Sequence, residues 1–130
     1  MRTAARENSG DMVGKVTSSV RYPGAVVEVT DMNFTDLIQS HQYFVVGCWA
    51  EWCGSCTTMA PIIEELAGEF GGEVMFGTCD AEMNLEVMAS FHILAIPTLL
   101  FFANGSLVGR LTGVHPKESI HASLLRVFVL

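Results

Sequence analysis

A continuous apolar run that leads into a pair of cysteines restricts the fold of this chain most strongly. The run covers residues 43–49 and is too apolar throughout for a strand at the edge of a sheet. It is expected to be buried on both faces, as strands are in a parallel sheet covered by helices. Trp52-Cys53-Gly54-Ser55-Cys56 comes next, and a helical pattern of apolar residues follows to about Phe70. The cysteines therefore stand where a strand ends and a helix begins.

This position indicates what the Cys-x-x-Cys motif does chemically. The first backbone N–H groups of a helix have no internal partner, and the helix dipole adds partial positive charge there. A sulfur in the first turn is therefore stabilised as the thiolate, which is the form that attacks disulfides. Cys53 is predicted to be that nucleophile. Cys56 lies one turn later on the same face, where it can resolve the mixed disulfide.

Four further segments are predicted to be strands, and together they indicate the fold class. They are rich in β-branched and aromatic residues, and they cover residues 25–29, 73–79, 99–102 and 106–112. Asn104-Gly105 is a strong signal for a hairpin turn, so the last two strands should pair antiparallel. Because helical patterns separate the earlier strands, the sequence predicts an α/β fold with a central mixed five-stranded sheet and helices on both faces.

Three helices are predicted besides the one at the cysteines. Asp31 or Asn33 can cap the first, which carries the apolar residues Phe34, Leu37 and Ile38. The second surrounds residues 85–91. Pro116 opens the last helix. The buried face of this last helix is expected to hold Ile120, Leu124, Leu125 and Phe128.

Composition and charge exclude several classes of protein. The chain has 130 residues, of which 50% are apolar, which suits one domain with a hydrophobic core. Its net charge of −7 and its lack of a Lys/Arg cluster argue against a nucleic-acid partner. No apolar run is long enough to span a membrane, and no apolar stretch follows Arg2 and Arg6 as it would in a secretory signal. We expect a cytoplasmic protein with a flexible extension over residues 1–23 and a folded domain over residues 24–130.

The four cysteines do not suggest a disulfide scaffold in such a chain, and one working pair in a reducing compartment fits better. Cys48 and Cys79 fall within predicted strands and are expected to be buried thiols, with a second disulfide as the alternative. Zinc needs four ligands, which one Cys-x-x-Cys and four histidines without ligand spacing do not provide. These histidines are His41, His92, His115 and His121. No metal or cofactor is expected, apart from the redox-active Cys53–Cys56 pair.

Three stretches of the sequence together resemble the thioredoxin family. Residues 49–61, with Trp-Cys-Gly-Ser-Cys at their centre, resemble the active-site segment of that family. Ile96-Pro97-Thr98 resembles its cis-proline loop, and Gly113 stands where the family has a glycine beside the active site. The match runs from about Ala25 to the end of the chain with its spacing intact, which makes it far more specific than a lone Cys-x-x-Cys.

The resemblance implies the thioredoxin fold and the reduction of protein disulfides by dithiol–disulfide exchange. It also implies a partner thioredoxin reductase, and an NADPH-linked and a ferredoxin-linked enzyme fit the motif equally well. A cis bond between Ile96 and Pro97 would expose the Ile96 backbone beside Cys53, where an extended substrate segment can add as a strand. The residues implied to form an apolar rim around the sulfur are Trp52, Pro97, Gly113 and Val114.

The chain departs from the family pattern at its active site. Ser55 stands where the family usually has proline, Gly47 where it has a buried aspartate, and Phe76 where a lysine pairs with that aspartate. Losing both charged partners together avoids leaving one buried charge unpaired. Water or the departing substrate thiolate is then expected to take the proton of Cys56. We also expect a less reducing potential than that of a relative with the proline and the aspartate. Both changes stabilise the reduced dithiol, and a more stable dithiol makes the corresponding disulfide a stronger oxidant.

Three hypotheses for the function follow from these residues. The first is a general protein-disulfide reductase that serves several targets. The second is a more oxidising, dedicated oxidoreductase or isomerase-like protein with a narrow set of partners, which the two departures keep open. The third is a binding module without turnover, and the two intact cysteines at the helix start argue against it.

Overall fold

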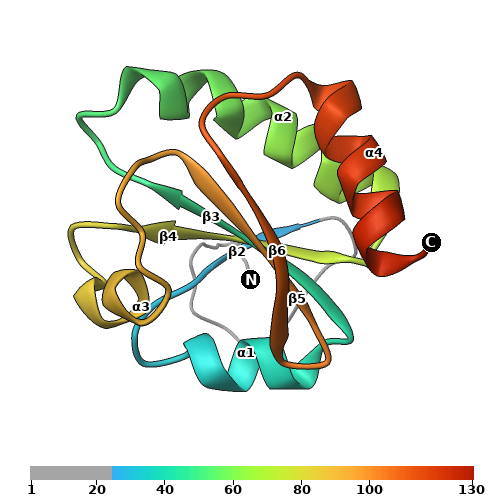
Figure 1. Cartoon of the computed structure of the whole chain (residues 1–130), viewed down its shortest axis with the longest axis horizontal. Helices are drawn as coiled ribbons and strands as arrows, with labels where there is room; N and C mark the ends of the chain where they lie inside the picture. Colours follow the sequence, from blue (N-terminus) through green and yellow to red (C-terminus); the bar gives the residue numbers. More distant parts are fainter. Residues whose placement is uncertain (1–24) are drawn as a thin grey trace.

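The computed structural model describes residues 25–130, which form a five-stranded sheet between two layers of helices (Figure 1). In chain order the elements are β2 (Val26–Glu28), α1 (Phe34–Ser40), β3 (Tyr43–Trp49), α2 (Gly54–Phe70), β4 (Met75–Asp80), α3 (Leu85–Ser90), β5 (Thr98–Ala103), β6 (Ser106–Thr112) and α4 (Lys117–Phe128). The order of strands across the sheet is β2-β4-β3-β5-β6. The extension predicted over residues 1–23 lies outside the described residues.

β3 is the central strand of the sheet. It pairs in parallel with β4 on one side and antiparallel with β5 on the other. Every residue from Phe44 to Cys48 is buried, which confirms the prediction from the continuous apolar run. β5 and β6 form the predicted antiparallel hairpin, and its turn residues Asn104 and Gly105 both have positive φ angles, of 53° and 83°. The predicted mixed sheet is therefore confirmed.

Successive side chains along each strand point to opposite faces of the sheet and therefore pack into two separate hydrophobic cores. The core beneath α2 and α4 includes Val45 of β3 and Phe76 of β4. The core beneath α1 and α3 includes Phe44 and Cys48 of β3. Figure 1 shows the same division, with α2 and α4 on one face of the sheet and α1 and α3 on the other. The two faces thus separate the helix that begins at the cysteine motif from the core around Cys48.

The buried face of α4 differs from the prediction at one residue. Ile120, Leu124 and Phe128 are buried as expected, but Leu125 is 37% exposed. A helix turns by about 100° per residue, so Leu125 is rotated away from the stripe that Leu124 belongs to. Ser123, which lies on the other side of Leu124, is buried instead. Position within the apolar stripe, rather than residue type alone, decides which leucine enters the core.

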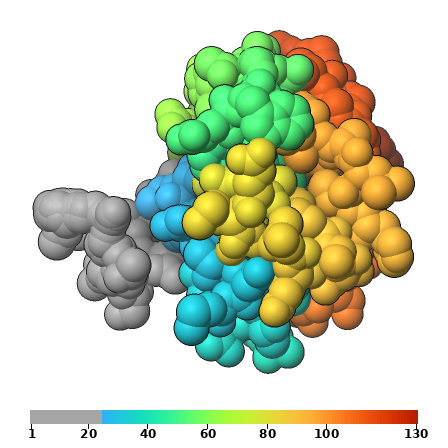
Figure 2. Space-filling model, turned by 90° about the vertical axis from the view of Figure 1, so that its left-hand side faces the viewer, coloured from blue at the N-terminus to red at the C-terminus, as the bar shows by residue number. Residues whose placement is uncertain are grey.

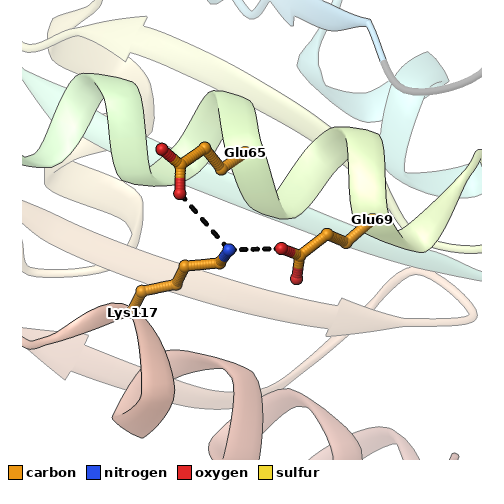
Figure 3. A network of polar contacts seen from close by, with 3 residues as sticks. All are labelled: Glu65, Glu69 and Lys117. Carbon is orange, nitrogen blue, oxygen red and sulfur yellow. Dashed lines mark hydrogen bonds and ion pairs between the residues drawn. The ribbon is translucent and has the colours of Figure 1, made fainter.

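An ion-pair cluster joins the start of α4 to α2. The Lys117 ammonium lies 3.3 Å from the Glu65 carboxylate and also contacts the carboxylate of Glu69, about one turn further along α2 (Figure 3). Its hydrogen bonds to Glu69 and Glu65 raise the pKa of Lys117 above the ordinary value for a lysine. Lys117 at the start of α4 therefore links this helix to α2 through its ion pairs.

Asp31 caps α3 and not α1, so one of the two alternatives for the α1 cap was wrong. Its carboxylate accepts hydrogen bonds from the backbone N–H groups of Val87 and Glu86, at 3.0 and 3.3 Å. Asn33 is the residue that precedes α1, but its side chain accepts from the N–H of Thr30 and makes no cap bond to the helix. Because β2 and β4 are neighbours, the loops that follow them meet at one edge of the sheet, and Asp31 reaches the later helix.

Candidate active site

The Cys53–Cys56 pair forms a disulfide at the first turn of α2. Cys53 is the residue that caps the helix, which begins at Gly54, and the two Cα atoms lie 5.4 Å apart. The backbone N–H of Cys56 donates a hydrogen bond to Sγ of Cys53, with 3.2 Å between nitrogen and sulfur. The helix start thus directs a backbone donor at the first sulfur, as its position after β3 predicts. Gly54 and Ser55 are exposed in the same turn.

The disulfide lies in a small apolar cluster at the end of β3. Cys53 and Cys56 keep only 6% and 8% of their surfaces exposed, and Ala50 is buried with them. Trp49 and Ile96 pack against this cluster, so the loop before β5 contacts the same site as the end of β3. The oxidised pair is therefore largely shielded from solvent by its neighbours.

The loop before β5 has the geometry that the sequence predicts. The Ile96–Pro97 peptide bond is cis, and Pro97 is buried. The N–H of Gly113 donates to the carbonyl oxygen of Pro97 at 2.8 Å, which joins the segment after β6 to this loop. Gly113 has a φ of 90°, a conformation that glycine adopts without steric cost. Val114, the next residue, is 48% exposed.

Trp52 stands at the surface beside the cysteines and is held there by Glu82, which no motif in the sequence indicated. Its side chain is 69% exposed, and its indole Nε1 donates to Oε2 of Glu82 at 2.6 Å. Glu82 follows β4, and the ends of the parallel strands β3 and β4 meet at one edge of the sheet. The pairing of these two strands was therefore the signal that could have identified Glu82.

Two acidic residues near the site, Glu51 and Asp80, have different environments. Glu51 is exposed to solvent. Asp80 is half-buried at the end of β4, and its Oδ1 accepts a hydrogen bond from the backbone N–H of Glu82 at 2.9 Å. The carboxylate of Asp80 therefore supports the loop that positions Glu82.

Uncharged residues, Gly47 and Phe76, occupy the two positions where the thioredoxin family has a buried ion pair. Gly47 is buried on β3, opposite Thr78 of β4 and Leu99 of β5. Phe76 is fully buried and packs against Phe70, with ring centroids 6.0 Å apart. A Cβ atom at residue 47 would lie 3.4 Å from the nearest atom, in the Leu99 side chain, which is an ordinary contact distance. The backbone therefore leaves room for a side chain to begin at this position.

Cys48 and Cys79 are free, buried thiols, as predicted, and they belong to the core on the opposite face of the sheet from α2. They face each other in register on β3 and β4. Burial, followed by the charge of Cys79, raises the pKa of Cys48 to about 12. Burial, followed by the charge of Asp31, raises the pKa of Cys79 to about 12 as well. Neither thiol can readily form the thiolate needed for exchange.

Neither a metal site nor a membrane-spanning helix is found within residues 25–130. No group of three or more His, Cys, Asp or Glu side chains in this range is arranged to hold a metal ion. No helix in this part of the chain is both long enough and apolar enough to cross a membrane.

A disulfide at the first turn of a helix, set after the central strand of this mixed sheet and beside a cis-proline loop, defines a thiol–disulfide oxidoreductase. The family model for thioredoxin matches residues 25–126. The thioredoxin of Staphylococcus saprophyticus is 43% identical over 96 residues, which cover 74% of this chain and 91% of that protein. The thioredoxin of Alicyclobacillus acidocaldarius is 39% identical over 103 residues, which cover 79% and 98% of the two chains.

Solved structures agree with this fold. A mutant thioredoxin from Halobacterium salinarum NRC-1 superposes with a TM-score of 0.76, and the match covers 84% of this chain and 96% of that one at 20% identity. The family model and the bacterial relatives place the chain in the thioredoxin family. It is a dithiol–disulfide oxidoreductase.

The reduced protein is expected to present two reactive thiols and two unreactive ones. At pH 8, a pKa of about 12 leaves only about one in ten thousand of the Cys48 and Cys79 side chains as thiolate. The colorimetric thiol reagent DTNB should therefore react rapidly with two thiols in the native protein and with two more only after unfolding. A Cys53→Ser/Cys56→Ser variant should lose the rapid reaction. Rapid reaction of a third or fourth thiol in the native protein would contradict the assignment.

Proposed function

We propose that this chain reduces disulfides in protein substrates, with Cys53 as the attacking thiol and Cys56 as the resolving thiol. The hydrogen bond from the backbone N–H of Cys56 to Sγ of Cys53 is the observation that carries this assignment. Negative charge on the Cys53 sulfur is stabilised by that donor and by the positive end of the α2 dipole. Cys56 lies in the same first turn of α2, bonded to Cys53, so it is placed to resolve the mixed disulfide.

The proposed reaction transfers two electrons from the dithiol to the substrate. The Cys53 thiolate attacks one sulfur of the substrate disulfide, which forms a mixed disulfide and releases one substrate thiolate. Cys56 then loses its proton and attacks Sγ of Cys53, which closes the intramolecular disulfide and releases the second substrate thiolate. The two substrate thiolates take up protons, one of which can come from Cys56. The Cys53–Cys56 disulfide in the structure corresponds to the oxidised end of this cycle.

The surface around the disulfide is proposed to bind an extended segment of the substrate. Ile96 packs against the cysteine cluster, so its backbone lies at the site where the substrate sulfur must arrive. Backbone hydrogen bonds to Ile96 would align the substrate as an added strand. Pro97 and Gly113 are tied together beside it, and the exposed side chains of Trp52 and Val114 supply apolar contacts. Gly54 and Ser55 complete the exposed first turn of α2.

A reductase partner is proposed to return the two electrons to the Cys53–Cys56 disulfide. An NADPH-linked and a ferredoxin-linked thioredoxin reductase both satisfy this requirement. We place the reaction in the cytoplasm, where a reducing environment keeps a dithiol available and leaves buried thiols such as Cys48 unpaired. The chain then acts as an electron carrier between the reductase and its target proteins. It needs no bound cofactor, because its own disulfide carries the electrons.

Reduction of insulin by the protein, with dithiothreitol as the electron donor, tests the proposed activity. The wild-type chain should accelerate the reduction, whereas Cys53→Ser should abolish the acceleration because the nucleophile is lost. Cys56→Ser should trap substrate proteins as mixed disulfides on Cys53, since the resolving thiol is absent. Cys48→Ser is the matched control and should keep most of the activity. Trapping by Cys53→Ser but not by Cys56→Ser would overturn the assigned roles.

The resolving step is expected to depend steeply on pH, because the uncharged Gly47 and Phe76 provide no base near Cys56. Gly47→Asp should flatten the pH–rate profile of mixed-disulfide resolution between about pH 6 and 9 by supplying a proton acceptor. Stopped-flow measurement of thiol release from a trapped substrate reports this step. Gly47→Asn is the control with the same shape and no charge, and it should keep the steep profile. Identical profiles for the aspartate and asparagine variants would rule out the idea.

A more oxidising, dedicated oxidoreductase or isomerase-like protein is the second candidate function. It is favoured by Ser55, which is exposed in the first turn of α2 and adds a backbone N–H that proline would lack. It is also favoured by the uncharged surroundings of Gly47, because a nearby negative charge would oppose formation of a thiolate. The equilibrium redox potential separates the two candidates, because general reductases have more negative potentials than oxidants.

A further inference from the structure

We propose that the face around the Cys53–Cys56 disulfide selects substrate segments in which lysine or arginine flanks the disulfide. This inference rests on the proposed reduction of protein disulfides and adds the chemical class of the substrate. It is carried by large exposed apolar side chains in the segments beside the disulfide and at the start of α3, and by the distribution of charge around them.

The apolar surface consists of four side chains that are unusually exposed for their type. Trp52 is 69% exposed, Met83 76%, Leu85 68% and Met32 93%. We call this group the α3-side patch. Figure 2 looks onto this face, where the green start of α2, the yellow segment around α3 and the blue-to-cyan segment after β2 lie side by side. Large apolar side chains that gather beside a reactive group are typical of a docking surface.

Hydrogen bonds hold the segments that carry the α3-side patch in place. Trp52 donates to Glu82 at 2.6 Å, and the N–H of Met83 donates to the carbonyl oxygen of Asp80 at 3.2 Å. Asn84 is buried, accepts from the N–H of Asp31 at 2.9 Å and donates to the carbonyl oxygen of Asp80 at 3.0 Å. The surface is therefore organised before a substrate arrives, which lowers the entropy lost on binding.

Charge is distributed very unevenly along the chain that forms this face. Residues 25–109 contain eleven Asp and Glu residues and no Lys or Arg. Three of the exposed acidic side chains adjoin the cysteine motif or the start of α3, namely Glu51, Glu82 and Glu86. The carboxylate of Glu82 is held by Trp52 through Oε2, and a carboxylate can accept further hydrogen bonds through its other oxygen. A cation on the substrate can therefore be bound at the edge of the α3-side patch.

The positively charged side chains of the described residues are engaged elsewhere. Lys117 contacts the carboxylates of Glu65 and Glu69 on α2. The guanidinium of Arg110 donates to the carbonyl oxygen of Phe91, just after the end of α3 that is remote from the patch. Arg126 lies near the end of α4, and its guanidinium is 3.5 Å from the Ser123 hydroxyl. Within residues 25–130, none of the ion pairs involves Glu51, Glu82 or Glu86, so these carboxylates are available to a substrate.

Charge complementarity decides which occupant the patch fits. A second copy of the chain would bring its own Glu51, Glu82 and Glu86 against the same residues, and like charges at an interface are costly. A segment with apolar residues and flanking Lys or Arg satisfies both the patch and its acidic edge. Attraction of this kind acts mainly on the rate of encounter and weakens as salt is added.

Two disulfide-linked peptide substrates that differ only in the residues flanking cysteine test this selection. One carries lysine on both sides and the other carries glutamate, and kcat/KM is measured with the full chain and dithiothreitol as the electron donor. At low salt the lysine peptide should be favoured about tenfold, and the preference should shrink at high salt. Equal kcat/KM values for the two peptides at low salt would refute the selection while leaving disulfide reduction intact.

Charge-reversal variants locate the effect on the molecule. Glu51→Lys/Glu86→Lys should bring the preference within about twofold at low salt. Glu73→Lys/Glu118→Lys makes the same change in net charge away from the cysteine motif, and it should keep most of the preference. Glu51→Gln/Glu86→Gln removes the two charges without reversing them and should give an intermediate preference for the lysine peptide. This variant replaces the charge-reversed one if Glu51→Lys/Glu86→Lys does not fold. An equal loss in the remote pair would overturn the assignment to this face.

Two further outcomes count against the inference. If neither peptide nor insulin is reduced, the proposed function itself fails. If sedimentation velocity shows that the full chain dimerises at the assay concentration, and Leu85→Ser abolishes the dimer, the patch belongs to a second copy. A monomer that retains the salt-dependent preference for lysine supports the inference.

Discussion

The placement of Cys53 at the start of α2 is the constraint on which the rest of the site depends. β3 is central in the sheet and buried on both faces, so its end is held firmly where α2 begins. There the backbone N–H of Cys56 meets Sγ of Cys53. The other parts of the site, from the cis-proline loop to the indole of Trp52, are positioned relative to this turn.

The interior beneath α2 is uncharged at residues 47 and 76, and the thioredoxin fold is kept. Phe76 occupies the core where a lysine would need a partner, and Gly47 on β3 brings no side chain to the same interior. An apolar replacement for a buried ion pair is often neutral for stability, so such a site can lose its internal base at little structural cost. The acidic side chains near the site lie instead at the surface, at Glu51, Glu82 and Glu86, where the proposed substrate would meet them.

Much of the fold and of the reactive centre could be predicted from sequence because those features are local. The apolar run of β3, the Asn104-Gly105 turn and the cysteine spacing each carry their own structural signal. The cap that Asp31 provides to α3 and the bond between Glu82 and Trp52 could not be predicted in the same way. Both depend on which strands are neighbours, and local periodicity does not report strand order.

The redox potential tests most directly whether the start of α2 controls the reactivity of Cys53. Wild-type protein, Ser55→Pro and Ser55→Ala are equilibrated with glutathione buffers, and the fraction of disulfide is measured. Proline removes a backbone N–H from the first turn of α2, so Ser55→Pro should have a more reducing potential than the wild type. Each tenfold change in the equilibrium constant corresponds to a shift of about 30 mV. Ser55→Ala keeps that N–H and should stay closer to the wild type. A Ser55→Pro potential equal to, or less reducing than, that of the wild type would contradict the account.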